Sequence, residues 1–175
     1  MRETLFNWLQ PSLPGARCLD LFAGTGALGF EAVSRGAGSV VLVERSARVA
    51  HRLDEIIARL QAADTIRVIR GDALQYLREA EEPFDVVFLD PPFHGDLLAQ
   101  ACSILGEREL VRPDGLIYLE THRRAAFPPL PDTWNLERQR ETGQVHFALA
   151  RNHGDGGRRQ APSSPDAPGF EYAGT

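Results

Sequence analysis

The feature that most constrains the fold of this chain is a regular alternation of short apolar runs with helical segments. Five runs rich in β-branched and other apolar residues predict strands at residues 16–21, 39–43, 66–69, 85–89 and 116–120. Helices are predicted between them at residues 28–34, 46–61, 74–79 and 97–105, and two further strands, 134–140 and 145–151, flank Gly143. This rhythm predicts an α/β fold with a mainly parallel sheet of seven strands, an antiparallel closing strand and helices on both faces.

The length and composition of the chain fit one globular domain. It has 175 residues, of which 43% are hydrophobic and 25% charged. Residues 152–175 are rich in Gly, Pro and Ser and predict a disordered tail behind a domain of residues 1–151. No apolar run approaches the roughly 20 residues of a membrane span, and residues 1–10 lack the apolar core of a signal peptide. We therefore expect a soluble, cytoplasmic protein.

The charged residues exclude several kinds of chemistry. All 19 basic residues are Arg, so a catalytic lysine, a Schiff base and a P-loop lysine are excluded. The net charge of −5 predicts no large basic surface for nucleic acid. It does not exclude a local basic patch, and the candidates for one are Arg123, Arg124, Arg138 and Arg140. The two cysteines have neither metal-type nor disulfide spacing, so they are interpreted as structural thiols and no metal site is expected.

A glycine-rich turn follows the first predicted strand, and its members are Phe22, Ala23, Gly24, Thr25 and Gly26. Its glycines let the backbone turn tightly and approach a ligand, and the helix that follows offers free N–H groups. The run matches the dinucleotide-binding pattern G-x-G-x-x-G, which is weak evidence because an ordinary tight turn also satisfies it.

Three carboxylates narrow the choice of ligand. Asp20, just before the turn, would repel a pyrophosphate but suits a cation, so the sulfonium and α-ammonium of S-adenosylmethionine fit better than NAD. Glu44 directly follows the second predicted strand and can accept both ribose hydroxyls of a nucleoside, unless it pairs with Arg45 or Arg48. Asp72 follows the third strand and can accept from an adenine amino group, cap the helix that begins at Ala73, or do both.

The most specific signal is the run Asp90-Pro91-Pro92-Phe93 after the fourth predicted strand. Two prolines fix two φ angles and remove two N–H donors, which leaves the Asp90 carboxylate and nearby carbonyls as a rigid set of acceptors. Phe93 adds a flat apolar face. This set suits a planar amino group conjugated to a ring, whereas the simpler alternative is a Pro-rich turn with a packed Phe.

These four motifs, in this order, resemble a Rossmann-like class I methyltransferase that depends on S-adenosylmethionine. The opening helix, Arg2-Glu3-Thr4-Leu5-Phe6-Asn7-Trp8-Leu9, and residues 20–29, 84–93 and 142–147 are similar to the RsmD family. Members of that family are bacterial enzymes that methylate the N2 amino group of one guanine in 16S ribosomal RNA. The family begins with a basic, Gly-rich stretch before this helix, which this sequence lacks, and such a stretch would contact RNA.

The resemblance implies S-adenosylmethionine as cofactor, no metal, and 16S rRNA in the small ribosomal subunit or its assembly intermediate as partner of a monomer. The catalytic residues expected are Asp90, Pro91, Pro92 and Phe93. The cofactor-binding residues expected are Asp20, Phe22, Ala23, Gly24, Thr25, Gly26, Glu44, Arg45, Asp72 and Ala73. The role of His122, near the same rim, is left open.

Three alternatives remain. The first is another amino-methyltransferase, acting on a DNA base or a protein glutamine. The second is a protein that binds S-adenosylmethionine without turnover because the N-terminal stretch is missing. The third is a nicotinamide oxidoreductase, against which Asp20 and Asp90 argue, since neither has a role in hydride transfer.

Overall fold

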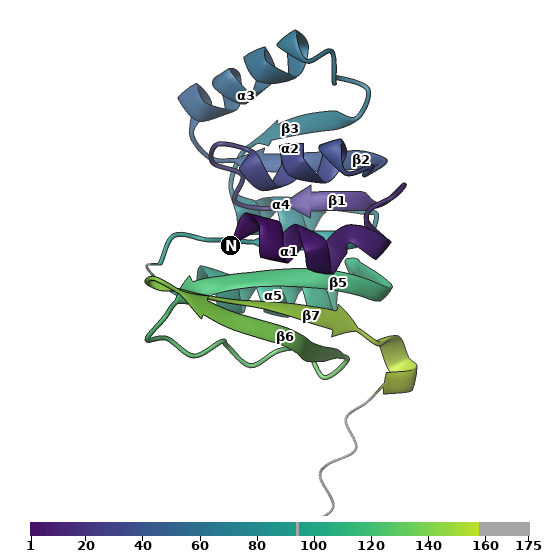
Figure 1. The fold of residues 1–175 in the computed structure, drawn as a ribbon, viewed down its shortest axis with the longest axis vertical. Helices are drawn as coiled ribbons and strands as arrows, with labels where there is room; N and C mark the ends of the chain where they lie inside the picture. The colour runs from purple at the N-terminus through teal and green to yellow at the C-terminus, as the bar shows by residue number, and fades with distance from the viewer. Residues whose placement is uncertain (94, 158–175) are drawn as a thin grey trace, which may run out of the picture.

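The computed structural model describes residues 1–93 and 95–157, which fold around one seven-stranded sheet (Figure 1). The strands are β1 (Arg17–Asp20), β2 (Ser39–Glu44), β3 (Ile66–Arg70), β4 (Phe84–Leu89), β5 (Val111–His122), β6 (Trp134–Thr142) and β7 (Val145–Asn152). The helices are α1 (Arg2–Leu9), α2 (Ala27–Ser34), α3 (Ala47–Arg59), α4 (Ala73–Glu79) and α5 (Leu97–Glu107), with short 3-10 helices η1 (Gln10–Ser12) and η2 (Gly154–Gly157). The predicted α/β class and the seven strands are confirmed.

The strand order is β3-β2-β1-β4-β5-β7-β6. The first five strands are parallel, whereas β7 lies antiparallel between β5 and β6, so the predicted closing pair is also confirmed. Strand β1 pairs with both β2 and β4, and the chain switches there from one half of the sheet to the other. In open parallel sheets, ligands bind beyond the carboxyl ends of the strands at such a switch point.

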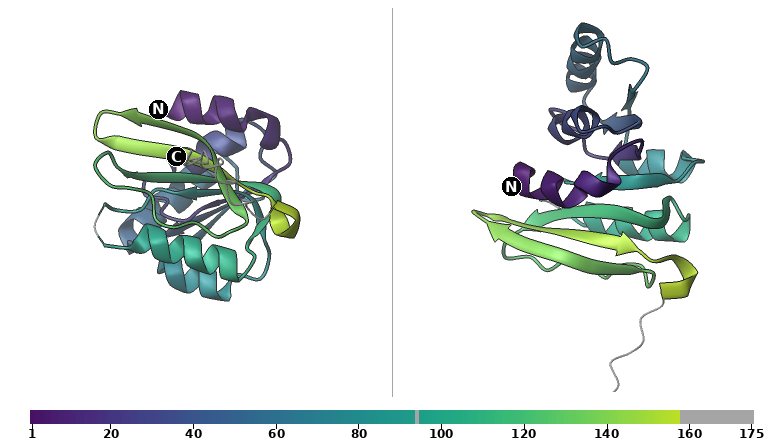
Figure 2. Two further views of the ribbon diagram at one scale, coloured as in Figure 1. Left: turned by 90° about the horizontal axis from the view of Figure 1, so that it is seen from below. Right: turned by 45° about the vertical axis from the view of Figure 1, so that its right-hand side comes forward.

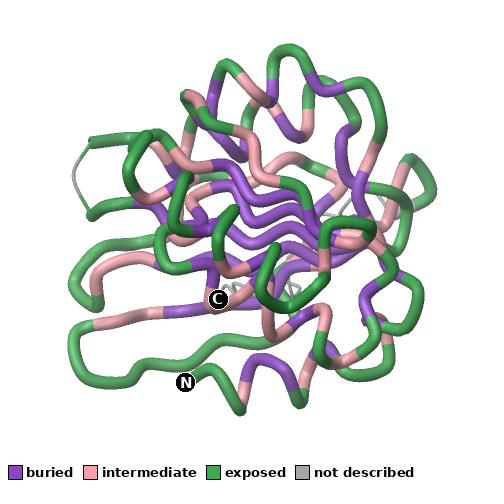
Figure 3. The backbone as a smooth tube through the Cα atoms, turned by 90° about the horizontal axis from the view of Figure 1, so that it is seen from above, coloured by how far each residue is buried: buried purple, intermediate pink, exposed green. Residues whose placement is uncertain are grey.

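Helices cover the sheet on both faces. Helix α1 lies on one face and helices α4 and α5 on the other (Figure 2, left). On the α1 face, Leu5, Phe6 and Leu9 of α1 share an apolar cluster with residues of α2, α3 and the strands. On the other face, α4 and α5 bury a second cluster that includes Leu77 and Cys102. The central strands are buried along most of their length (Figure 3), which keeps their carboxyl ends rigid.

The sequence positions two helix starts directly at the ends of strands. The Ser46 hydroxyl accepts a hydrogen bond from the Val49 N–H and caps α3. The Asp72 carboxylate accepts from the Gln75 N–H at 2.9 Å and caps α4. Such caps stabilise a helix by about 1 kcal/mol each. They also hold the segments after β2 and β3 in place.

Strand β5 is longer than predicted. The sequence predicted a strand over residues 116–120, whereas β5 begins at Val111, which pairs with Phe84, and ends at His122. The register shifts between Phe84 and Val86, so the extra residues are accommodated as an irregularity within the strand. Asp114 takes a positive φ of 65° there.

The ordered fold extends past residue 151, where the tail was predicted to begin. The Asn152 side chain is buried and donates to the carbonyls of Val111 and Arg112, and it accepts from the Gly154 N–H. These bonds tie Asn152, and Gly154 through it, to the start of β5. The rest of the predicted tail, residues 158–175, lies outside the described residues.

Both cysteines are buried and unbonded, which agrees with their interpretation as structural thiols. Within residues 1–93 and 95–157, no helix has the length and apolar character that crossing a bilayer would require.

Candidate active site

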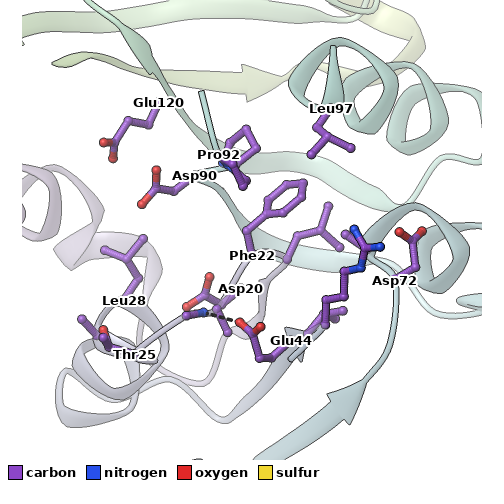
Figure 4. Close-up of a pocket in the computed structure, with 18 of the residues that line it drawn as sticks. Asp20, Phe22, Thr25, Leu28, Glu44, Asp72, Asp90, Pro92, Leu97 and Glu120 are labelled. Carbon is purple, nitrogen blue, oxygen red and sulfur yellow. Dashed lines mark hydrogen bonds between the residues drawn. The ribbon is translucent and has the colours of Figure 1, made fainter. Parts of the chain in front are cut away.

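A cavity of about 670 Å³ opens at the carboxyl ends of the parallel strands, across the switch between β1 and β4. Its walls come from the turn after β1 and from the ends of β2, β3, β4 and β5 (Figure 4). Every site residue predicted from the sequence lines it except Gly26. Segments far apart in the sequence therefore meet in one pocket of the size that holds a small ligand.

The turn after β1 depends on two glycines in the left-handed region. Gly24 has φ 54° and Gly26 has φ 77°, a conformation that other residues adopt at a cost. At Gly26 a Cβ would also lie 2.5 Å from the Phe30 ring. Gly26 directly precedes the first residue of α2 and does not line the pocket. It shapes the pocket indirectly, because its conformation sets the path of the backbone in the turn.

Asp20 sits at the floor of the pocket, 2% exposed, and accepts a hydrogen bond from the Gly29 N–H at 3.2 Å. Burial raises the pKa of this carboxyl to about 7, the Gly29 N–H lowers it, and the Asp90 and Glu44 carboxylates raise it. No basic side chain forms an ion pair with Asp20 in the described part of the chain. This arrangement is suited to a cationic ligand.

Glu44 braces the glycine-rich turn. One carboxylate oxygen accepts from the Gly24 N–H at 2.8 Å (Figure 4). The other accepts from the Ser46 N–H at 2.8 Å. The alternative in which Glu44 pairs with Arg45 or Arg48 is not seen among the described residues. Each carboxylate oxygen accepts more than one hydrogen bond, so both keep capacity for a ligand hydroxyl.

Asp72 lines the pocket while it caps α4. The capping interpretation from the sequence is therefore confirmed. The cap uses Oδ1, so the carboxylate keeps a second oxygen for a ligand donor, and the two roles are compatible.

The Asp90-Pro91-Pro92-Phe93 segment follows β4 and forms the opposite wall. The Phe93 ring is 49% exposed, which is high for a large apolar side chain, and it meets the His122 ring edge-to-face at 5.8 Å. An exposed aromatic face at the mouth of a pocket is suited to stacking on a planar ligand.

Glu120, at the carboxyl end of β5, is a site residue that our sequence reasoning missed. It is 6% exposed, lines the pocket, and accepts a hydrogen bond from the Tyr118 hydroxyl at 2.8 Å. Its carboxyl and that of Asp90 face the same space (Figure 4). The signal was available, because Glu120 is the last residue of the fifth predicted strand, just as Glu44 directly follows the second.

The two carboxyls influence each other. Burial, repulsion by the Glu120 carboxylate and a hydrogen bond to it raise the pKa of Asp90 to about 6. Burial also raises the pKa of Glu120, while hydrogen bonds from Tyr118 and Asp90 lower it. Burial, and after it the Glu120 and Asp90 carboxyls, raise the pKa of the Tyr118 phenol. The phenol therefore stays protonated and donates its hydrogen bond.

The pocket as a whole is acidic. Among the residues that the structure describes, the lining contains Asp20, Glu44, Asp72, Asp90 and Glu120, and Arg45 is its one basic residue. Within residues 1–93 and 95–157, no group of three or more His, Cys, Asp and Glu side chains is placed to hold a metal ion.

The arginines considered for nucleic acid lie outside the pocket lining. Arg123 pairs with Glu141 at 3.0 Å, and the Arg138 guanidinium lies 5.7 Å from the centre of the Trp8 ring. Arg124 is exposed just beyond His122, and its N–H donates to the His122 Nδ1. A basic contact surface at these positions stays a prediction.

Comparison with known proteins matches residues 1–151 to a family described as "Conserved hypothetical protein 95". The chain is 38% identical to ribosomal RNA small subunit methyltransferase D of Escherichia coli, covering 89% of this chain and 78% of that protein. It is 42% identical to the protein of the same name from Haemophilus influenzae, covering 87% and 80%.

Solved structures agree. The protein yhhF from Escherichia coli superposes with a TM-score of 0.83 at 39% identity, over 86% of this chain and 84% of that one. The protein HI0767 from Haemophilus influenzae superposes with a TM-score of 0.80 at 42% identity, over 86% and 95%. The match spans the turn after β1, the Asp90 segment and the closing strands alike, and the chain therefore belongs to the RsmD family that its sequence motifs predicted.

Proposed function

We propose that this protein transfers a methyl group from S-adenosylmethionine to the exocyclic N2 amino group of a guanine in 16S ribosomal RNA. The observation that carries the proposal is the rigid Asp90-Pro91-Pro92-Phe93 wall, set directly across an acidic pocket from a glycine-rich turn. The names of the relatives supply the class of RNA, and the pocket supports the chemistry of an amino group.

The residues of the β1–β3 side fit S-adenosylmethionine. A buried carboxylate at Asp20, without a basic partner among the described residues, suits the positive charge of this cofactor. Glu44 would accept from the ribose hydroxyls, and Asp72 from the adenine amino group. When bound, the cofactor supplies an electrophilic methyl group on a sulfonium.

The chain's own residues act on the nucleophile. The amino nitrogen of guanine is a poor nucleophile because its lone pair is delocalised into the ring. Acceptors at the Asp90 carboxylate and the Pro91 carbonyl would hold both amino hydrogens and favour a more tetrahedral nitrogen, which localises that lone pair. Asp90 takes the departing proton or passes it to water, and most of the remaining rate comes from positioning.

Phe93 would hold the base in the pocket. A base within folded RNA must leave its stack to reach this site, and the half-exposed ring gives it a new stacking partner. Such stacking is worth about 1–3 kcal/mol per base. We expect the enzyme to act as a monomer in the cytoplasm, where small subunits assemble.

The test is methyl transfer from labelled S-adenosylmethionine to small ribosomal subunits from a strain that lacks its own RsmD-type enzyme. The expected result is label in 16S rRNA with the native protein and none with Asp90→Ala. Binding of the cofactor without transfer would overturn the proposal and favour a binding protein. Label on DNA or on protein glutamine, with none on 16S rRNA, would favour another amino-methyltransferase.

A further inference from the structure

Three oxygen-bearing side chains form a connected group at the β4–β5 end of the pocket. The Tyr118 hydroxyl donates to Oε2 of Glu120 at 2.8 Å, and the Glu120 carboxyl meets the Asp90 carboxyl. Both carboxyls line the pocket and face its interior (Figure 4). Two acidic groups are thus placed side by side where the substrate base is proposed to enter.

The surroundings offer this pair little positive charge. Among the described residues, the other ionisable groups that interact with this pair are the Asp20 carboxylate and the Tyr118 phenol, and neither is basic. Arg45, the basic residue of the lining, follows β2, which β1 separates from β4. Beyond the Tyr118 hydroxyl and the hydrogen bond that the two carboxyls share, the described residues offer the pair no further donor, so a ligand that brings its own donors would stabilise the desolvated carboxylates.

The edges of the nucleobases differ in how many donors lie side by side. Guanine presents its N2 amino group next to the N1–H, so two adjacent donors face outward. Adenine presents its amino group next to N1 and cytosine next to N3, and both of these ring nitrogens are acceptors that a carboxylate repels. A flipped base is read along this edge. A pair of carboxylates beside the reacting amino group therefore matches guanine alone.

We propose that Glu120 is the residue that selects guanine, by accepting the N1–H of the base while Asp90 accepts its amino group. This assignment rests on the proposed function and deepens it. Tyr118 acts as a positioning residue: its hydroxyl occupies Oε2, which leaves Oε1 of Glu120 for the base. The buried β5 backbone on which both residues lie fixes their spacing from Asp90, since β4 and β5 pair directly.

The test compares guanine with 2-aminopurine, which keeps the 2-amino group but has an acceptor at N1. The modified position is first located with the native enzyme, and small subunits are then reconstituted with either base there. The native enzyme is expected to prefer guanine by at least about 100-fold in kcat/KM, because an unpaired buried acceptor rejects the analogue. In Glu120→Gln, Tyr118 holds the amide oxygen, so the amide NH₂ faces the base and can donate to N1 of 2-aminopurine. The guanine preference should fall by at least about tenfold.

The controls separate specificity from folding. Glu81→Gln removes an exposed carboxylate outside the pocket and should leave the preference unchanged. Cofactor affinity and the melting temperature of each variant show whether the fold is intact. If Glu120→Gln does not fold, Glu120→Asp takes its place, since it keeps the charge but withdraws the carboxylate from the base, and the preference should again fall.

The outcomes distinguish the two proposals. Failure of the native enzyme to methylate guanine N2 would overturn the proposed function and this inference with it. Methylation of guanine N2 by the native enzyme, with an unchanged guanine preference in a folded Glu120 variant, would overturn the role of Glu120 alone. A smaller preference for guanine over 2-aminopurine in a folded Glu120 variant would support the role of Glu120 in selecting the base.

Discussion

The two ends of the pocket treat their carboxylates in opposite ways. At the β1–β3 end, Glu44 and Asp72 each accept hydrogen bonds from backbone N–H groups, which the glycine-rich turn and the first turns of α3 and α4 supply. At the β4–β5 end, Asp90 and Glu120 face each other, and in the described part of the chain their one other partner is the Tyr118 hydroxyl. Backbone donors hold the carboxylates of the first end, whereas among the described residues the second end has no backbone donor and would gain further donors from a ligand.

This difference indicates that the two ends of the pocket have different roles. Backbone amides orient the carboxylates of the β1–β3 end before any ligand arrives, which lowers the ordering cost of binding. The β4–β5 end keeps two partly desolvated carboxyls with raised pKa values, as is common for groups that exchange protons. We infer that affinity for the cofactor depends on the first end and the rate of methyl transfer on the second.

Removing the Asp90 carboxylate should produce the largest effect and break only the β4–β5 end. Asp90→Ala is expected to lower kcat about 10³-fold, because it loses an acceptor for the amino hydrogens and a proton acceptor. The affinity for S-adenosylmethionine, measured by calorimetry, should change by less than about threefold. A parallel loss of affinity would show that the two ends are not separate.

Asp20, at the floor between the two ends, should affect stability through its ionisation. Its pKa of about 7 in the fold lies above the usual value of 3.8, so the folded state binds a proton more tightly than the unfolded chain. The free energy of unfolding should therefore fall as the pH rises from about 4 to above 7. At pH 8, Asp20→Asn should raise this free energy by about 4 kcal/mol, since the pKa rises from 3.8 to about 7 in the fold and each pKa unit corresponds to about 1.4 kcal/mol.

The measurement for Asp20 is urea unfolding at pH 5 and pH 8, without cofactor. The gain from Asp20→Asn should be clearly smaller at pH 5, where the native carboxyl is already protonated in the fold. An equal gain at both pH values would mean that ionisation of Asp20 is not the cause.

Glu44→Gln should disturb cofactor binding at the β1–β3 end and leave the β4–β5 end unchanged. The amide can accept one of the two backbone N–H bonds, but its NH₂ opposes the second donor. The Kd for S-adenosylmethionine is expected to rise about 30-fold, while kcat at saturating cofactor stays within about threefold. A fall in kcat with unchanged Kd would reverse the roles assigned to the two ends.

Phe93→Ala should produce the smallest effect, and it tests whether the β4–β5 end also binds the substrate base. Losing one stacking partner is expected to raise KM for small subunits about tenfold. Cofactor affinity should be unchanged, because the ring lies at the mouth of the pocket and is half exposed. Phe93→Tyr, which keeps the aromatic face, should restore the native KM, and a failure to do so would argue against stacking.

Much of the fold was predictable because its determinants are local. The strand runs, the Ser46 cap and the Asp72 cap are set by neighbouring residues, and so is the turn at Gly24. The start of β5 was wrong because its first residues, Val111 onward, are stabilised by pairing with β4 and not by a regular pattern. The ordered structure of Asn152 was not predictable from its neighbours, because its side chain is held by hydrogen bonds to the distant start of β5.

The position of a residue at the pocket was predictable where its motif stands at the end of a strand, as at Asp20 and Asp90, which both line the pocket. It was less predictable where function arises from adjacency between strands. Glu120 becomes a candidate site residue only because it lies beside Asp90. That position depends on the pairing of β4 with β5 and on the hydrogen bond from the Tyr118 hydroxyl to the carboxylate. Gly26 shows the converse, since its pattern suggested contact with a ligand whereas its φ of 77° serves the turn.

The most direct test of this account is the identity of the methylated nucleoside. Small subunits from a strain lacking its own RsmD-type enzyme would be methylated by the native protein, and their 16S rRNA digested and analysed by mass spectrometry. The account predicts N2-methylguanosine as the new nucleoside, absent after reaction with Asp90→Ala. A methyl group on an adenine or cytosine amino group, or on a ring carbon, would contradict the roles given to Asp90 and Glu120.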